Sequence, residues 1–344
     1  MQNSLFERYR IVVDAGQVSV RLDKFLGSRL PCVSRNRIQA GIRESSVLVN
    51  EKPVKPSYRI QPHDTIQVFL PTPPRTDHVA GEAIPIAIIY EDDDLLVVNK
   101  EAPMVVHPAH ENWTGTLVNA LVYHCDGLPS TASNQTRPGL VHRLDKGTSG
   151  LLVVAKHEDS LANLAYQFMQ HTVSREYQAL VWGDVRQNQG TIDIPIGRSA
   201  QDRRVMVPYS PEAGIGKQAV THYEVVERLG YVTLVRCKLE TGRTHQIRAH
   251  MKHLGHPLFG DPRYGGDRVV VGQRTSKYVS FVRNSLSTLP YQALHAKTLG
   301  FIHPKTKMLL SFQAPLPQGF QDVLNRWRVY TTAQSRDANK NNTQ

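Results

Sequence analysis

Asp145 is the side chain in this sequence that is best placed to do chemistry. Arg143 and Lys146 flank it, and a Gly/Thr/Ser turn separates it from an apolar run at residues 151–155. A short apolar run bounded by turn residues is typical of a buried strand. A carboxylate on a tight loop that enters such a strand is held rigidly and partly desolvated, and such carboxylates serve as nucleophiles or proton acceptors. The alternative is an aspartate that only caps a turn.

A buried Asp145 would need a fixed cation beside it, because an unpaired buried charge strongly destabilises a fold. Residues 239–257 supply basic side chains at helical spacing, with Thr244 as the expected helix cap. Arg248 and Arg243 are the two candidates for the cation. The residues expected to end this helix are Gly255 and Pro257, and those expected to form its apolar stripe are Ile247, Met251 and Leu254.

The bulk composition indicates a polyanionic partner. A chain of 344 residues suggests about two domains. Its net charge of +11 is typical of a protein that binds nucleic acid, although charge alone does not exclude a merely basic soluble protein. The segment from Gly214 to Lys217 lacks the spacing of a phosphate-binding loop. We therefore predict no nucleotide and no other cofactor.

Cysteine and histidine usage predicts neither disulfides nor a metal site. The three cysteines (Cys32, Cys125, Cys237) are odd in number and far apart, which fits a reducing cytoplasm. His124-Cys125 is too short to form a zinc site alone, and the four histidines of residues 239–257 lack a His-Glu-x-x-His arrangement. The N-terminus has no apolar signal core and no segment could span a membrane, so we expect a soluble, cytoplasmic protein and a monomer.

Residues 18–70 are predicted to form a small basic module. Two helices at 21–30 and 33–42, the second capped by Ser34, precede strands at 46–50 and 64–70. Between residues 21 and 60 there are nine Lys/Arg and three Asp/Glu, and Arg35, Arg37 and Arg43 fall near one face of the second helix. Such a face either binds a polyanion or is simply solvated.

A Pro-rich linker at residues 71–83 leads to a second domain at 84–328, which is followed by a polar tail at 329–344 that we expect to be disordered. Many strands with scattered helices predict an α+β fold with a mixed, largely antiparallel sheet. The predicted strands are residues 86–90, 95–99, 151–155, 177–182, 221–226, 232–238, 299–301 and 308–312, and the predicted helices are 116–123, 160–171, 244–254 and 320–327.

Residues 137–154 and 240–265 resemble the motifs of the RluA/RluD-type pseudouridine synthase family. The order helix, basic helix, strand in residues 18–70 resembles the S4 RNA-binding module, although Asn50-Glu51 replaces the Asn-Gly typical of its tight turn. The resemblance implies a pseudouridine synthase fold and an isomerase that converts uridine to pseudouridine in RNA. Such a reaction requires no cofactor. The arrangement is most similar to enzymes acting on large-subunit rRNA.

The resemblance also implies roles for single residues. Asp145 would be the catalytic carboxylate, Arg248 its cationic partner, and Tyr177 the aromatic ring that packs against the target base, although a tyrosine there is more commonly a core residue. The target base would be flipped out of its helix. The residues expected to contact RNA are Arg143, Arg35, Arg37, Arg43, Lys100, His107, Arg243 and His245.

Two departures from the family pattern lie in loops. Gly147 occupies a position that is often Asp, and residues 99–108 lack a Lys-Pro-x-Gly turn while keeping Lys100 and His107. We expect these changes to affect rate or RNA choice. Residues 267–290 are basic and are predicted to be loop-like, as an RNA-contacting insert or a plain surface loop.

Three alternatives and the chemical route stay open on sequence alone. The substrate could be tRNA. The protein could be a non-catalytic RNA-binding ribosome-assembly factor. It could also be a glycosidase in which Asp145 works with a second acid such as Glu240, although basic surroundings disfavour a neutral sugar. For a synthase, the carboxylate could attack C1′, add to C6 of the ring, or remove a proton from C2′.

Overall fold

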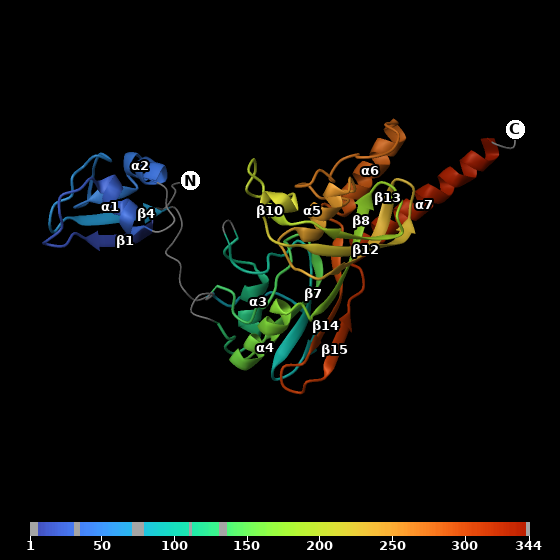
Figure 1. Cartoon of the computed structure of the whole chain (residues 1–344), viewed down its shortest axis with the longest axis horizontal. Coiled ribbons are helices and arrows are strands. Elements are labelled where there is room, and N and C mark those ends of the chain that lie inside the picture. The colour runs from blue at the N-terminus through green and yellow to red at the C-terminus, as the bar shows by residue number, and fades with distance from the viewer. Residues whose placement is uncertain (1–5, 31–34, 71–78, 110–111, 131–135, 342–344) are drawn as a thin grey trace. The chain divides into compact units, whose positions relative to one another are not determined.

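The chain divides into two compact units, Met1–Asp77 and His78–Gln344, which are described separately. The structure is a computed structural model, shown in Figure 1, and it describes residues 6–30, 35–70, 79–109, 112–130 and 136–341. Residues 71–78 of the predicted linker and the predicted helix cap Ser34 therefore lie outside the described residues.

The N-terminal unit is a four-stranded sheet in the order β1-β4-β2-β3 with two helices. Its predicted helices and strands are confirmed, and Ile38 and Ile42 are buried on the inner face of the second helix. The strand β1 was not predicted, and it pairs antiparallel with β4, so the unit begins before residue 18. Charged residues interrupt its apolar alternation, as in many edge strands. The elements are β1 Phe6–Val12, α1 Leu22–Arg29, α2 Arg35–Arg43, β2 Val47–Val49, β3 Lys52–Pro53 and β4 Thr65–Leu70.

The turn between β2 and β3 keeps its tight geometry without glycine. Asn50 and Glu51 have φ angles of 50° and 65°, the left-handed pair that a type I′ turn requires. Asn50 holds the turn through its side chain, which donates to the Asp64 carboxylate and accepts from the Thr65 amide. Asparagine tolerates this backbone region because of such local hydrogen bonds.

The C-terminal unit is built on a nine-stranded sheet in the order β5-β6-β7-β14-β8-β13-β12-β9, with β15 paired to β14. Among the described strands of this sheet only β7 and β14 pair in parallel, which confirms the predicted mixed, largely antiparallel sheet. Its strands are β5 Ala87–Glu91, β6 Leu95–Lys100, β7 Ser149–Ala155, β8 Ser174–Trp182, β9 Gln189–Asp193, β12 Val220–Arg228, β13 Val232–Leu239, β14 Leu294–Ile302 and β15 Leu309–Gln313.

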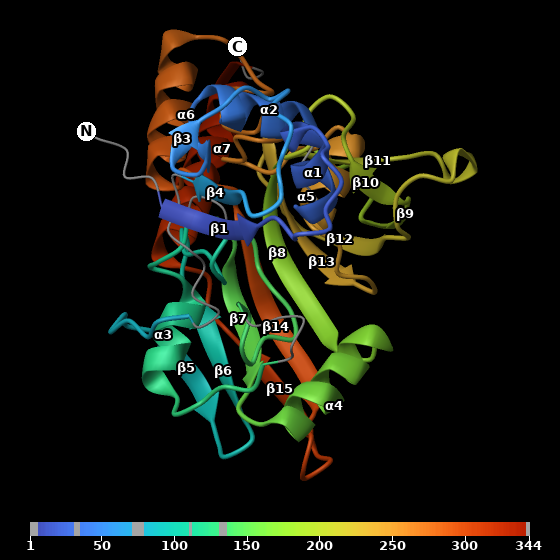
Figure 2. The ribbon, with the colours of Figure 1, turned by 90° about the vertical axis from the view of Figure 1, so that its left-hand side faces the viewer.

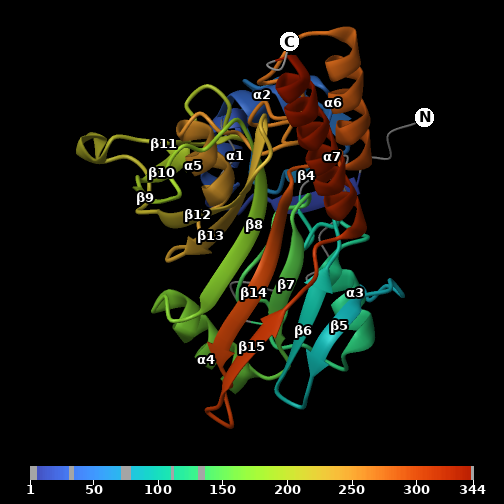
Figure 3. The same ribbon diagram turned by 90° about the vertical axis from the view of Figure 1, so that its right-hand side faces the viewer.

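Helices bury parts of both faces of this sheet. Alternate residues of β8 enter different cores, Ala179 and Val181 on one face and Leu180 and Trp182 on the other. Figures 2 and 3 show α3 and α4 near one end of the long strands β8 and β14, and α6 and α7 near the opposite end. The helices are α3 Leu117–His124, α4 Glu158–Met169, α5 Gln246–His253, α6 Ser276–Thr288 and α7 Gln318–Asn341, and a small hairpin joins β10 Ile196–Arg198 to β11 Met206–Pro208.

Two segments predicted to lack regular structure are helical. Residues 276–288 of the predicted loop form α6, because Tyr278 and Val282 are buried against Trp327 of α7. The helix α7 continues to Asn341 instead of ending in a disordered tail after residue 328. The Tyr330 ring of α7 stacks on Phe281 at 4.5 Å, so contacts with α6 extend the helix past the predicted boundary.

Strand register brings distant segments to one level of the sheet. Lys100 pairs with Gly150, Gly150 with Ala296, and Ala296 with Tyr177. Asp145 lies five residues before Gly150, so these strand pairings bring the Asp145 loop towards Tyr177. The close approach requires glycine at position 150, where φ is 115° and an added Cβ would lie 2.3 Å from the Ala296 carbonyl oxygen.

Gly150→Ala should therefore destabilise the C-terminal unit by about 2–5 kcal/mol, because it adds both a backbone strain and a steric clash. Gly127→Ala is the matched control, since φ is 76° but an added Cβ would meet nothing within 4 Å. The control should lose only about 1–2 kcal/mol. Denaturant unfolding of both variants measures the difference, and equal losses would contradict the proposed clash.

Candidate active site

A cationic cleft of about 580 Å³ opens beside the Asp145 loop. Its walls come from the loop before β7, the end of α4, the start of β8 and the loop after β13. Among the described residues that line it, Asp145 is the one carboxylate, and it faces several arginines. The lining side chains include His107, Arg137, His142, Arg143, Asp145, Phe168, Met169, His171, Arg175, Tyr177, Arg243 and Thr244.

Asp145 forms an ion pair with Arg248. The Arg248 Nη1 donates to Asp145 Oδ2 at 2.8 Å, and the Asp145 side chain is 18% exposed. The backbone closes a turn behind it, because the Thr148 amide donates to the Asp145 carbonyl at 3.0 Å. Arg243, the competing cation, instead donates its Nε to the Gln218 carbonyl at 2.9 Å. Of the two candidates, the structure places Arg248 beside the carboxylate.

Asp261 fixes the arginine. Its fully buried carboxylate accepts Arg248 Nε at 2.7 Å and Nη2 at 2.9 Å, which leaves Nη1 for Asp145. The backbone amides of Arg263 and Tyr264 also donate to Asp261. Burial works against the charged guanidinium, but the hydrogen bonds and charges of the two aspartates hold the pKa of Arg248 above its ordinary value.

The helix that carries Arg248 starts differently from the prediction. His245, not Thr244, is the N-cap of α5, with φ at 55° and no side-chain capping bond. Gln246 stabilises this start instead, since its side-chain oxygen accepts from the Arg243 amide and the Thr241 hydroxyl. The predicted apolar stripe is buried at two positions, but Leu254 at the end of the helix is exposed.

His245 lies next to the carboxylate, with Nε2 3.8 Å from Asp145 Oδ2. Burial lowers the pKa of His245 to about 4, against the charge of Asp145, so its imidazole is neutral at neutral pH. Its Nδ1 lies 3.1 Å from the Tyr264 hydroxyl, which donates in turn to the Met206 carbonyl. The Arg248 guanidinium lies over the Tyr264 ring at 5.0 Å. His245, predicted as an RNA contact, is thus part of a partly buried network.

Tyr177 is the fourth residue of β8 rather than its first, and it is almost fully buried at the cleft wall. Burial raises the pKa of its phenol, partly offset by the charge of Arg175, so the ring is neutral at neutral pH. Tyr177 and Asp145 line the same cleft. The structure therefore brings all three residues predicted to be catalytic into one site.

Lys100 and His107, which were predicted to contact RNA, are both buried. Lys100 is 2% exposed and its Nζ donates to the carbonyls of Glu101, Met104 and Lys146 at 2.8, 2.9 and 3.4 Å. It thereby ties the end of β6 to the Asp145 loop. His107 lines the cleft with an Nδ1 that has no hydrogen-bond partner within the described part of the chain.

Several side chains of this site were not singled out from the sequence. Asp261 and Tyr264 follow α5 in a loop, and nothing in their spacing relates them to Asp145. Arg175 and Phe168 reach the cleft from β8 and α4. A basic residue two positions before Tyr177 on a strand faces the same side, and this period-two pattern was the available signal for Arg175.

The basic helix of the N-terminal unit is partly engaged in internal ion pairs. Arg35 donates through Nε and Nη2 to the buried Asp23 carboxylate, which Arg21 and Gln39 also bind. Arg35 remains half-exposed and Arg43 is exposed. The Arg37 side chain lies outside the described residues, although its backbone belongs to α2.

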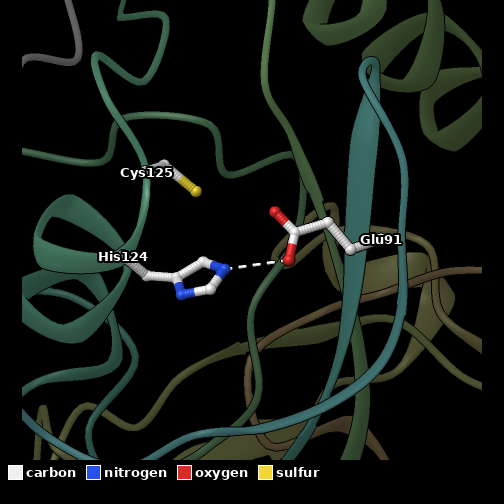
Figure 4. A group of neighbouring side chains, drawn as sticks. All are labelled: Glu91, His124 and Cys125. Carbon is white, nitrogen blue, oxygen red and sulfur yellow. Dashed lines mark hydrogen bonds and ion pairs between the residues drawn. The ribbon is translucent and has the colours of Figure 1, made fainter.

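Two clusters resemble metal sites but are internally hydrogen-bonded. Glu91, His124 and Cys125 converge as shown in Figure 4, so the structure adds a third group to the His-Cys pair. His124 Nε2 lies 2.8 Å from one Glu91 oxygen, and Lys156 donates to the other at 3.0 Å. These contacts favour an ion-pair cluster. The second group, Asp92, Asp94 and His303, is likewise bonded through His303 Nε2 and Asp92 at 2.9 Å.

The protein has an α+β fold with a cationic cleft, which is suited to bind a polyanion. A model of the RNA pseudouridylate synthase family matches residues 94–253, and a model of the S4 domain matches residues 20–66. An uncharacterized RNA pseudouridine synthase of Chlorobaculum parvum is 48% identical, covering 92% of this chain and 97% of that protein. Ribosomal large subunit pseudouridine synthase D of Zymomonas mobilis is 43% identical, covering 91% and 95%.

The solved structure of human RNA pseudouridylate synthase domain containing 1 superposes with a TM-score of 0.50 at 26% identity, covering 72% of this chain and 96% of that one. The chain belongs to the RNA pseudouridine synthase family, with an N-terminal S4 domain, and the enzyme is an isomerase. No helix within the described ranges is long and apolar enough to cross a membrane.

Arg248→Ala should destabilise the C-terminal unit by ~3–5 kcal/mol, because it leaves the buried Asp261 carboxylate without its cation. Arg243→Ala is the matched control, since it removes a partly buried arginine bonded to one carbonyl, and should cost about 1 kcal/mol or less. Chemical denaturation compares the two. An unchanged midpoint for Arg248→Ala would contradict a stabilising buried pair.

Lys100 should make stability depend on pH. Burial lowers the pKa of Lys100 to about 7, against the charge of Asp145, from an ordinary value of about 10.4. Between about pH 7 and about pH 10 the unfolded chain binds this proton and the folded chain does not, so the free energy of unfolding rises with pH, by up to about 1.4 kcal/mol per unit.

The Lys100→Met variant lacks this contribution, so the stability of the parent relative to Lys100→Met should increase from pH 7 to pH 9. Parallel denaturant titrations at the two pH values measure that difference. A difference that stays constant would show that Lys100 keeps its proton in the folded protein.

Proposed function

We propose that this enzyme isomerises specific uridines of large-subunit rRNA to pseudouridine, with Asp145 as the catalytic carboxylate. The observation that carries the proposal is the Asp261–Arg248–Asp145 chain, which presents one oriented carboxylate in a cationic cleft. The rRNA target is supported by the relatives from Zymomonas mobilis and Neisseria meningitidis, whose names specify the ribosomal large subunit. The S4 domain supports RNA as the polyanion.

The two oxygens of Asp145 have different roles in this proposal. Arg248 binds Oδ2, whereas Oδ1 accepts no hydrogen bond from the residues that the structure describes. Oδ1 is therefore the reactive atom, and the ion pair holds it in one orientation. Attack on C1′, addition to C6 and removal of the C2′ proton all require one positioned carboxylate oxygen. Each route breaks the N1–C1′ bond, rotates the uracil and bonds C5 to C1′. C5 then loses its proton and N1 gains one, so the product is an isomer of uridine.

Tyr177 stacks on the target base in this mechanism. A uridine within a helix cannot reach Asp145, so it must be flipped out at a cost of a few kcal/mol. Stacking on an aromatic ring is worth roughly 1–3 kcal/mol per base and offsets part of this cost. The neutral phenol of Tyr177 avoids a second negative charge beside Asp145. The exposed Arg143 on the same loop is suited to contact a phosphate near the flipped nucleotide.

The test is tritium release from unmodified large-subunit rRNA labelled with 5-³H-uridine. The parent should release tritium, and Asp145→Asn should lower the rate by more than about 10³-fold while folding and RNA affinity are kept. Asp126→Asn is the matched control, since it removes an exposed carboxylate that does not line the cleft.

Three results would contradict parts of the proposal. An active, folded Asp145→Asn variant would remove Asp145 from its role. Tritium release from bulk tRNA but not from rRNA would show that the substrate is tRNA. Tight RNA binding without release from either RNA would favour a non-catalytic assembly factor.

A further inference from the structure

Arg175 is a buried cation that has no ionic partner among the described residues. The residue is 7% exposed, and no group in the described ranges forms a hydrogen bond with its Nε. Its Nη2 makes a long contact of 3.3 Å with the Glu240 carbonyl oxygen. Across the described part of the chain no carboxylate forms an ion pair with it. Buried arginines are ordinarily paired with an acid, because desolvation of a lone charge is costly.

Strand geometry directs this guanidinium towards the cleft. Arg175 and Tyr177 are two residues apart on β8, so their side chains leave the sheet on the same face. Both line the cleft with Asp145. The Phe168 ring supports the guanidinium at 5.4 Å. Such support fixes the position of the charge without neutralising it.

Gly242 leaves the space that the guanidinium needs. An added Cβ at Gly242 would lie 2.8 Å from Arg175 Nη1. The loop that carries Gly242 is the one that precedes α5 and Arg248. Arg175 Nη1 has no hydrogen-bond partner among the residues that the structure describes, so the guanidinium keeps donors for a ligand. The unused donors of Arg175 therefore lie beside a position without a side chain, where a ligand oxygen has room to approach.

We propose that Arg175 binds a backbone phosphodiester of the RNA next to the flipped uridine. The inference rests on the proposed function, because it takes the cleft to hold the target nucleotide. A phosphodiester is favoured over a base edge, since it supplies the full negative charge that the buried guanidinium lacks and matches its fork of donors. The only carboxylate among the described lining residues, Asp145, is already bound by Arg248. Arg175 is therefore a substrate-binding residue with no assigned role in proton transfer.

The first experiment measures turnover of the full-length enzyme on 5-³H-uridine-labelled rRNA over a range of KCl concentrations. Arg175→Met should lower kcat/KM by at least about tenfold, mainly through KM, and should reduce the slope of log kcat/KM against log salt by about 0.7–0.9. Arg175→Lys keeps the charge and should restore most of the slope. Lys238→Met is the matched control, because it removes an exposed charge from the other face of the sheet.

The second experiment separates binding from structural support. Without RNA, Arg175→Met should melt at a temperature at least as high as that of the parent, because it removes an uncompensated buried charge. A lowered melting temperature with unchanged kcat/KM would overturn the proposal and make Arg175 a structural residue. If turnover falls but the salt slope is unchanged, the proposal is overturned, and Arg175 contacts a neutral group of the base rather than a phosphate.

RNA affinity distinguishes failure of this inference from failure of the proposed function. Filter binding of the same rRNA compares Asp145→Asn with the double variant Asp145→Asn/Arg175→Met. If the double variant binds the rRNA more weakly and with a smaller salt dependence, the result supports the phosphate site even if the parent releases no tritium. Full turnover by Arg175→Met with an unchanged slope overturns the phosphate site and leaves the proposed function intact.

Discussion

The active site depends on one arginine shared between two carboxylates. Asp261 takes two donors of Arg248 from a fully buried position, and Asp145 takes the third at the cleft. The orientation of the partly buried Asp145 is therefore set by Asp261, which is fully buried and cannot contact a substrate. The buried pair offsets its desolvation through short charge-assisted bonds and two backbone amides. Asp145 is held rigidly in this way without being fully buried itself.

Two basic side chains near the Asp261–Arg248–Asp145 hydrogen-bonded chain have no bonded carboxylate among the described residues. Among the described residues Lys100 donates to carbonyls alone beneath the Asp145 loop, and Arg175 lies beside Tyr177 with unused donors. A buried basic group without a bonded carboxylate is unfavourable for the free protein. Functional sites commonly retain such local conflicts, because a fully satisfied site would have less to gain from its ligand.

The sequence predicted what local patterns determine and missed what tertiary contacts determine. Apolar runs predicted eight of the nine strands of the C-terminal sheet, and residue types around Asp145 predicted its loop. The strand β9 was missed, and so was the first half of β14, which pairs with Tyr177. The helix α6 and the end of α7 were missed because each is stabilised by aromatic contacts with the other. Asp261 was missed for the same reason, since its partner is thirteen residues away and only folding brings them together. Thr244 failed as a cap because Gln246 holds that turn.

The register of the strands places the side chains of the candidate site together within the C-terminal unit. Tyr177 faces the cleft only because Ala296 pairs with it, and a slip of one residue would turn its ring to the opposite face. Gly150 pairs with the same Ala296 and carries the Asp145 loop to that level. Asp145, Arg248, Asp261 and Tyr177 all lie within His78–Gln344. The geometry of these four side chains is therefore set by one sheet and the loops and helix attached to it.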